Sequence, residues 1–439
     1  MTESKVITRF APSPTGFLHI GGVRTALFSF LFARKNAGTF ALRIEDTDKA
    51  RNREEWTQGL VDDLKWLGLN HDVFIKQSDR IDIHKSYIKK LIEGGHVYIS
   101  KEKIEEGEKA GQENEVIRFN NPNKKVTFTD TIRGEITIDT TDLGDFIIAR
   151  NIDEPLYHLV VVIDDFEMGI THVIRAEEHL SNTPRQILIQ EAIGAPRPLY
   201  AHLPLVLAED RSKLSKRKHG ESVSLTYYRN KGYLPEAILN CVALIGWNPG
   251  TNQEIFSLEE LIQTFDMGKV QKGGAIFNIE KLNWINKKYI EKMTIEEFAE
   301  KAKDFLPKNI NKKILFLIKE KISYFGEIQS FIDGELSFVN TIADYAKESL
   351  MWKQEKDIAN TKTYLKTIMD LLSPLDDFSK ENVKSILWPL AEEKGKGNVL
   401  WPMRYALSGK DKSPDPFIIS EILGKEETLK RLTSAYEKL

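Results

Sequence analysis

Apolar and polar residues at the start of the chain follow patterns typical of short strands and longer helices. Residues 6–10 form a strand pattern, and apolar residues recur at helical spacing from residue 20 to residue 33, after a turn rich in proline and glycine. A second strand is expected at residues 39–44 and a second helix at residues 53–67. Alternating strands and helices predict a parallel sheet, which binds ligands at the carboxyl ends of its strands.

Residues 96–145 interrupt this alternation. They are polar, rich in Glu, Lys and Asn, and contain short β segments at residues 126–129 and 135–139. We therefore expect an insertion into the sheet domain. The α/β pattern resumes afterwards, with an apolar strand predicted at residues 158–163 and a helix at residues 182–193.

The second half of the chain loses the strand signal. Residues 235–244 predict a helix that begins with a proline, and from about residue 290 onward the apolar spacing is almost entirely helical. The predicted organisation is a split sheet domain at residues 1–95 and 146–205, an inserted domain at residues 96–145, a connecting region at residues 206–300 and an all-α region at residues 301–439.

The composition is that of an ordinary globular protein, with 41% hydrophobic and 29% charged residues among 439. The single cysteine, Cys241, excludes intramolecular disulfides and a cysteine-based structural zinc site. The N-terminus lacks the apolar core of a signal peptide, and the longest aliphatic run, residues 159–163, is far too short to span a membrane. We therefore expect a cytoplasmic protein without a membrane partner.

The net charge of −3 gives no general support for a nucleic-acid partner, because phosphate binding usually requires a basic face. Residues 301–439 carry a net charge of +2 and the rest of the chain −5. Any RNA-binding surface must therefore arise from local clustering of Lys and Arg.

The first motif that indicates chemistry lies between the first strand and the first helix. Residues 9–22 read Arg-Phe-Ala-Pro-Ser-Pro-Thr-Gly-Phe-Leu-His-Ile-Gly-Gly. Glycines at such a turn let the backbone approach a phosphate, a helix N-terminus favours anions, and His19 can donate to a phosphate oxygen. The alternative is a proline-rich turn with one surface histidine.

The second motif is basic. Residues 213–218 read Lys-Leu-Ser-Lys-Arg-Lys, and five of the eight residues from Arg211 to Lys218 are Lys or Arg. Such a run is often only a solvated charged surface. Two lysines that flank a serine also suit a loop that covers a triphosphate, with each ammonium as a point charge for phosphate oxygens.

Together, the two motifs resemble the signatures of the class I aminoacyl-tRNA synthetases, which read His-Ile-Gly-His and Lys-Met-Ser-Lys-Ser in that family. Here residues 19–22 read His-Ile-Gly-Gly and residues 213–217 read Lys-Leu-Ser-Lys-Arg, variants that resemble the glutamyl branch. Further segments similar to this branch follow in the same order, at residues 43–51, 164–186, 283–284 and 401–409.

The resemblance implies the fold of the bacterial glutamyl type. This is an α/β Rossmann-like catalytic domain with a parallel sheet, an inserted α+β domain that binds the tRNA acceptor end, and an all-α C-terminal anticodon-binding region. The connecting region would contact the tRNA stem and carry the basic loop, and relatives suggest a monomer. The implied reaction is ATP-dependent ligation of L-glutamate to tRNA(Glu) through a glutamyl adenylate, with release of AMP and pyrophosphate.

In such a reaction the α-carboxylate of glutamate is already an anionic nucleophile, so catalysis is mainly positioning and stabilisation of charge on phosphorus. The resemblance assigns this role to His19, Lys213 and Lys216, with Mg²⁺ sharing the charge. The residues expected to bind ATP are Thr15, Gly16, His19, Gly21, Gly22, Lys213, Leu214, Ser215, Lys216 and Arg217.

Glutamate carries two carboxylates and one ammonium, so a selective site needs two cations, preferably arginines, and one anion. By resemblance, Arg9 and Arg175 bind the carboxylates and Glu45 the ammonium. Arg175 would reject glutamine, because an uncharged amide leaves a buried guanidinium unpaired. Outside the motif, we would interpret Arg175 as a structural ion pair with Glu177 or Glu178. The residues expected to bind glutamate are Arg9, Ala11, Ser13, Glu45, Tyr157 and Arg175.

Three positions depart from the family pattern. Val161 stands where many members have Asn or Ser near the substrate, further along the strand expected to carry Tyr157, and water is expected to compensate. Tyr98 is followed by Ile and Ser instead of the cysteines of a zinc knuckle, so neither zinc nor another protein-held metal is expected. Gly22 replaces a histidine, and Thr15 or a backbone N–H is expected to act as the phosphate donor.

The remaining histidines show no metal-binding spacing, and we interpret them as structural or hydrogen-bonding residues, with His179 near the nucleotide. The residues concerned are His158, His172, His179 and His202.

Of four alternative functions, the sequence argues against three and leaves one open. A truncated relative that modifies a tRNA base would lack the helical C-terminal region, and a glutaminyl-tRNA synthetase would have a β-barrel there. A catalytically inactive RNA-binding protein would not need His19, Lys213, Lys216 and Arg175 together. An enzyme that also charges tRNA(Gln) differs only in residues near the anticodon, which the sequence does not identify.

Overall fold

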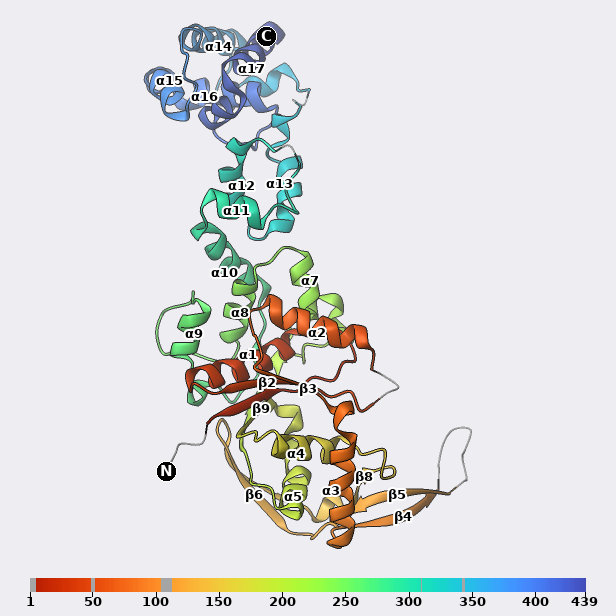
Figure 1. The fold of residues 1–439 in the computed structure, drawn as a ribbon. Helices are drawn as coiled ribbons and strands as arrows, with labels where there is room; N and C mark the ends of the chain where they lie inside the picture. The colour runs from red at the N-terminus through yellow and green to blue at the C-terminus, as the bar shows by residue number, and fades with distance from the viewer. Residues whose placement is uncertain (1–4, 49–51, 104–112, 309, 342–343) are drawn as a thin grey trace. The chain divides into compact units, whose positions relative to one another are not determined.

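The computed structural model describes residues 5–48, 52–103, 113–308, 310–341 and 344–439. Contacts divide the chain into two compact units, Met1–Tyr289 and Ile290–Leu439. The strands lie in the first unit, and the described part of the second unit is helical (Figure 1). The expected α/β fold with an all-α C-terminal region is therefore confirmed.

A seven-stranded sheet organises the first unit, in the order β3-β2-β1-β9-β10-β6-β7. All neighbouring strands in it are parallel except the last pair, which forms an antiparallel hairpin. The strands are β1 (Ile7–Phe10), β2 (Thr39–Ile44), β3 (Val73–Lys76), β6 (Lys125–Asp130), β7 (Gly134–Asp139), β9 (His172–Ala176) and β10 (Leu199–Leu203).

The central strands are covered by helices on both faces, and their residues are therefore buried nearly throughout. The helix α1 (Ile20–Lys35) packs against β1, β2 and β9, while α4 (Tyr157–Glu167) and α5 (Thr183–Ile193) share a core with the opposite face (Figure 1). The chain leaves β1 through α1 and leaves β9 through α5. The crossover direction therefore reverses between β1 and β9, and ligands of parallel sheets bind at such a point.

The strand predicted at residues 158–163 is wrong, because these residues lie inside the helix α4. Leu159–Ile163 is buried all round, and such a run shows no alternation that distinguishes a buried helix from a buried strand. Burial between α3 and α5 overrides the β preference of its three valines. Val161 therefore lies one helical turn beyond Tyr157, is 2% exposed, and is not part of the cavity lining described below.

The β segments expected at residues 126–129 and 135–139 form β6 and β7, but this hairpin extends the main sheet through a pairing of Asp130 with Tyr200. A separate antiparallel sheet contains β4 (Val97–Lys103), β5 (Glu113–Phe119) and β8 (Phe146–Ala149). Part of the expected insertion is thus integral to the main sheet. The domain boundaries given above stay a prediction.

The remaining strands and α-helices of the first unit lie before β4 and after β10. They are α2 (Glu54–Trp66), α3 (Ile81–Glu93), β11 (Val206–Leu207), α6 (Lys216–His219), α7 (Leu225–Asn230), α8 (Pro235–Ala243), α9 (Leu258–Thr264), β12 (Ala275–Ile276) and α10 (Ile279–Lys292), the last of which continues into the second unit. The proline-opened helix expected at residues 235–244 is α8, and Cys241 is buried in it.

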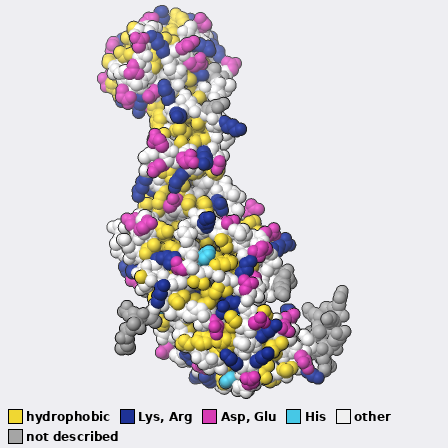
Figure 2. All heavy atoms as spheres, in the orientation of Figure 1, with side chains coloured by type: hydrophobic (Ala, Val, Ile, Leu, Met, Phe, Trp, Pro, Cys, Tyr) yellow, Lys and Arg dark blue, Asp and Glu magenta, His cyan; other side chains and the backbone are white. Residues whose placement is uncertain are grey.

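In the second unit, the four longest helices pack against one another around fully buried apolar residues such as Leu387 and Met403. On the face visible in Figure 2, acidic and basic side chains are mixed over these helices. None of the described helices has the length and apolar character of a membrane span. The helices are α11 (Ile295–Lys301), α12 (Leu315–Lys321), α13 (Ile328–Asp333), α14 (Ile358–Leu372), α15 (Lys380–Lys394), α16 (Lys396–Ser408) and α17 (Pro416–Lys438).

Candidate active site

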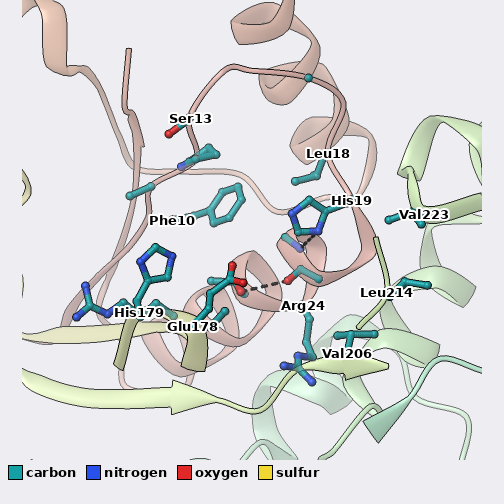
Figure 3. Close-up of a pocket in the computed structure, with 18 of the residues that line it drawn as sticks. Phe10, Ser13, Leu18, His19, Arg24, Glu178, His179, Val206, Leu214 and Val223 are labelled. Carbon is teal, nitrogen blue, oxygen red and sulfur yellow. Dashed lines mark hydrogen bonds between the residues drawn. The ribbon is translucent and has the colours of Figure 1, made fainter. Parts of the chain in front are cut away.

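A cavity of about 620 Å³ lies at the carboxyl ends of β1 and β9, at the crossover reversal of the main sheet. Figure 3 shows Phe10, His19, Glu178 and His179 around it. The lining comes from residues between 9 and 25, from Glu45, Leu60 and Tyr157, from residues between 174 and 179, and from residues between 204 and 224. Sheet topology therefore brings distant segments of the chain to one place.

The cavity contains nearly every residue that the sequence analysis selected. All six residues expected to bind glutamate line it. Nine of the ten residues expected to bind ATP do so as well, and the exception is Arg217 on α6. The imidazole of His19, both motif lysines and the Arg175 guanidinium thus share one cleft.

His19 caps the N-terminus of α1. Its Nδ1 accepts a hydrogen bond of 2.9 Å from the backbone N–H of Gly22, so the proton of a neutral ring sits on Nε2 (Figure 3). Burial lowers the pKa of His19, which favours this neutral form. A side chain at position 22 would place its Cβ 2.8 Å from Leu18 Cδ1. The local packing therefore leaves a Cβ no room at this position unless Leu18 moves.

The basic loop also contributes to the cavity lining. The Leu214 N–H donates to the Val206 carbonyl at 3.0 Å, which fixes the start of the loop beside β11. The Lys213 ammonium pairs with the Glu178 carboxylate, and the Lys216 Nζ lies 5.6 Å from the centre of the Phe17 ring. Two ammonium groups are thereby held at the rim of the cavity that contains His19.

Arg9 and Glu45 belong to a buried charge network. Asp165 accepts from Arg9 Nε at 3.1 Å and from Arg43 Nη1 at 2.6 Å, and Arg43 Nη2 lies 3.3 Å from Glu45 Oε1. Burial disfavours the charged form of Asp165, but Arg9 and Arg43 outweigh it and lower the pKa of Asp165. Burial raises the pKa of Glu45. Asp165 therefore orients both arginines from beneath the cavity.

Arg175 is 6% exposed and projects from β9 into the cavity. Its Nε donates to His202 Nε2 at 3.1 Å and its Nη2 donates to Thr183 Oγ1 at 2.9 Å. The alternative ion pairs of Arg175 are excluded, because Glu177 pairs with Arg133 and Glu178 with Lys213. In the described ranges, no carboxylate forms an ion pair with Arg175.

Tyr157 and His179 face each other at the edge of the cavity. The Tyr157 hydroxyl lies 3.1 Å from His179 Nδ1. Burial raises the pKa of Tyr157 to about 12 and lowers that of His179 to about 4. Both side chains are therefore neutral near pH 7 and act as hydrogen-bonding groups.

Two family descriptions match the chain. One, "tRNA synthetases class I (E and Q), catalytic domain", matches residues 5–115 and 97–284, and the other, "Anticodon binding domain", matches residues 297–436. The chain belongs to the class I glutamyl- and glutaminyl-tRNA synthetase family. This confirms the resemblance on which the sequence analysis relied.

Relatives within this synthetase family match the chain along its whole length. A protein of Aquifex aeolicus named glutamate–tRNA ligase is 42% identical, over 99% of this chain and 100% of that protein. A protein of Desulforamulus reducens with the same name is 38% identical, over 97% of this chain and 98% of that protein. The crystal structure of a glutamate tRNA ligase from Elizabethkingia meningosepticum, described as in complex with its amino acid, is 34% identical with a TM-score of 0.88, and 99% of each chain is covered.

Several residues that shape the site of this synthetase were not predicted from the sequence. Arg43 and Asp165 were part of family-like segments, but their pairing depends on strand and helix positions that the sequence does not give. Arg24 lines the cavity and donates to the carbonyls of Pro204 and Ile245. The available signal for Arg24 was an arginine within a largely apolar stretch of the predicted helix.

Proposed function

We propose that this chain joins L-glutamate to tRNA(Glu) in an ATP-dependent reaction that passes through glutamyl adenylate. The observation that carries the proposal is that one cavity combines His19 and Lys213 with the buried Arg175. His19 and Lys213 can bind phosphate oxygens. Arg175 is a cation whose hydrogen-bond partners among the described residues are neutral groups. It therefore retains its attraction for a ligand carboxylate.

In the first step, an oxygen of the glutamate α-carboxylate forms a bond to the α-phosphorus of ATP while the bond to the pyrophosphate oxygen breaks. The Nε2–H of His19 donates to a phosphate oxygen, and Lys213 and Lys216 stabilise the charge that develops on the phosphates. No general base is needed, because the carboxylate is already anionic. Arg175 and Arg9 hold the carboxylates of glutamate, and Glu45 and the Tyr157 hydroxyl hold its ammonium end.

In the second step, a terminal ribose hydroxyl of tRNA attacks the acyl carbon and loses its proton, and AMP leaves with the bonding electrons of the acyl–phosphate bond. The C-terminal unit matches an anticodon-binding description, which supports a tRNA substrate. We infer tRNA(Glu) as the main substrate, in keeping with the names of the relatives.

Mg²⁺ belongs to this proposal as a companion of ATP. Where the chain is described, no three His, Cys, Asp or Glu side chains group as a metal site. Mg²⁺ commonly keeps its waters and uses phosphate oxygens with one or two carboxylates, and Glu178 supplies a carboxylate beside Lys213. The residues present therefore fit a metal that arrives with the nucleotide, where it supplies positive charge to the phosphates. We expect no zinc requirement.

The test is pyrophosphate exchange into ATP, measured with glutamate and with glutamine, each with and without tRNA. The reaction is expected to depend on glutamate, and charging assays are expected to favour tRNA(Glu) over tRNA(Gln). Exchange that responds equally to glutamate and glutamine would refute the assignment of the amino acid. Absence of exchange and of charging with tRNA present would refute the enzyme itself.

A further inference from the structure

Three neighbouring strands place an arginine, a histidine and an aspartate in a row beneath the cavity. Arg175 on β9 and His202 on β10 are register partners, and Asp130 ends β6, the next strand. Arg175 Nε lies 3.1 Å from His202 Nε2, and His202 Nδ1 lies 2.7 Å from Asp130 Oδ2. His202 is fully buried and Asp130 is 1% exposed. The aspartate thus reaches Arg175 only through the imidazole.

The hydrogen bonds in this row determine which ring nitrogen of His202 carries the proton. The Nε of arginine is a donor only, so His202 Nε2 must be the unprotonated acceptor. The proton of the neutral ring then sits on Nδ1 and points at the carboxylate of Asp130. Burial lowers the pKa of His202 even though Asp130 opposes the shift, which agrees with a neutral ring.

This arrangement holds one edge of the guanidinium and gives it no ion-pair partner among the described residues. His202 takes the Nε edge of Arg175, and Thr183 takes Nη2. In the described ranges Nη1 has no hydrogen-bond partner, and the residue is 6% exposed in the cavity lining. A carboxylate in the place of His202 would neutralise the arginine, whereas a neutral imidazole orients it without doing so.

We propose that His202 and Asp130 are positioning residues that set the specificity of this site for a side-chain carboxylate. The inference rests on the proposed function, in which Arg175 binds that carboxylate. His202 orients the fork, and Asp130 fixes the tautomer that lets His202 accept. The ligand supplies the negative charge that Arg175 lacks among the described residues, which an amide does not do.

A purely structural role is the competing explanation. Asp130 also accepts from the backbone N–H groups of Ile132 and Arg133 and of His202, and thereby holds the β6–β7 hairpin against β10. A structural role predicts lower melting temperatures and equal losses for all substrates. A positioning role predicts a selective change in the KM for glutamate.

The chain offers a matched control for this test. His84 Nε2 lies 2.9 Å from Asp164 Oδ1, and both side chains are fully buried in the same unit. Neither residue lines the cavity described above. His84→Gln therefore disturbs a comparable buried pair without touching Arg175.

The experiment measures pyrophosphate exchange with the full chain and tRNA, together with the melting temperature, for His202→Leu, His202→Gln, Asp130→Asn and His84→Gln. We expect His202→Leu to raise the KM for glutamate about tenfold or more and to leave the KM for ATP within about twofold. His202→Gln, which keeps an acceptor near the position of Nε2, should restore most of the loss. Asp130→Asn should behave like His202→Leu, because the amide N–H favours the other tautomer of His202.

The proposal is overturned if His202→Leu keeps the KM of the parent for glutamate, if it changes both KM values equally, or if His84→Gln matches its effect. If His202→Leu does not fold, Asp130→Asn decides by the same criteria. Arg175→Ala distinguishes failure of the positioning role from failure of the proposed carboxylate site. Loss of glutamate activation in Arg175→Ala with unchanged His202→Leu overturns only the positioning role, whereas unchanged activation in Arg175→Ala overturns the proposed carboxylate site and the positioning role together.

Discussion

Lys213, in the basic loop, forms an ion pair with Glu178, which follows β9, so the loop and the segment after β9 are linked at the cavity. Both side chains are about half exposed, at 55% and 46%. Exposed pairs of this kind contribute only about 0–1 kcal/mol. The pair therefore places Lys213 at the cavity and opens readily when phosphate oxygens compete for the ammonium.

Removal of a loop lysine should impair chemistry more than amino-acid binding. In Lys216→Ala, and likewise in Lys213→Ala, we expect the rate of glutamate activation to fall about 100-fold, because a cation that stabilises the transition state is lost. The KM for glutamate should change about threefold at most. Single-turnover adenylate formation measures the rate, and equal effects on rate and glutamate binding would contradict the role. Lys218→Ala, a lysine of the same loop that pairs with Asp210 and does not line the cavity, is the control.

Removal of the Arg175 guanidinium should abolish glutamate activation while ATP binding survives. The loss should exceed about 100-fold in kcat/KM, because a charge-assisted bidentate contact disappears. Arg175→Lys should recover little, since an ammonium lacks the fork. Calorimetric titration with ATP checks that the nucleotide site is intact. Glutamate activation at the parent rate would show that Arg175 does not bind the substrate.

The free energy of unfolding should fall as the pH is lowered from 6.5 to 4, and part of this fall should depend on His158. Burial, with smaller contributions from Arg185 and Arg175, lowers the pKa of His158 to about 4. Below pH 6.5 the unfolded chain binds a proton that the folded chain does not, so the free energy of unfolding decreases as the pH falls. The stabilisation that comes from neutral His158 is fully present above pH 6.5. Between pH 6.5 and pH 4, its loss lowers the free energy of unfolding by at most about 1.4 kcal/mol for each pH unit.

The variant His158→Gln checks this pH dependence, because it removes the titrating group and keeps a polar side chain. Its melting temperature should decrease less than that of the parent between pH 7 and pH 5. Parallel curves for the two proteins would argue that His158 is not buried in its neutral form.

A methyl group at Gly397 should destabilise the second unit. A Cβ there would lie 2.5 Å from Nε1 of Trp352, so the indole or the start of α16 must move. We expect Gly397→Ala to lower the free energy of unfolding by about 1–3 kcal/mol. Gly59→Ala in α2 is the matched control, since no atom lies within 4 Å of its Cβ position, and it should stabilise by about 0.4–1 kcal/mol. Denaturant unfolding measures the free energy of unfolding of both variants. Equal changes in the two would exclude a steric clash at Gly397.

The sequence by itself determined the local elements and the residues with reactive chemistry. The strand at residues 7–10, the glycine-rich turn and the helix from Ile20 follow from apolar spacing and from turn residues, which act over a few positions. The resemblance to the synthetase family, carried by motifs in a fixed order, gave the six residues expected to bind glutamate, and the structure places them in one cavity.

Tertiary structure decided what depends on neighbours far away in the chain. Residues 159–163 form a helix because α3 and α5 bury them, and their own pattern does not distinguish a helix from a strand. The β6–β7 hairpin joins the main sheet through a strand 70 residues further on, and this pairing brings Asp130 to His202 and His202 to Arg175. Hydrogen bonds between strands act over a few ångströms in space, whatever the separation in sequence. Only the folded chain therefore reveals which buried histidine is hydrogen-bonded to which arginine.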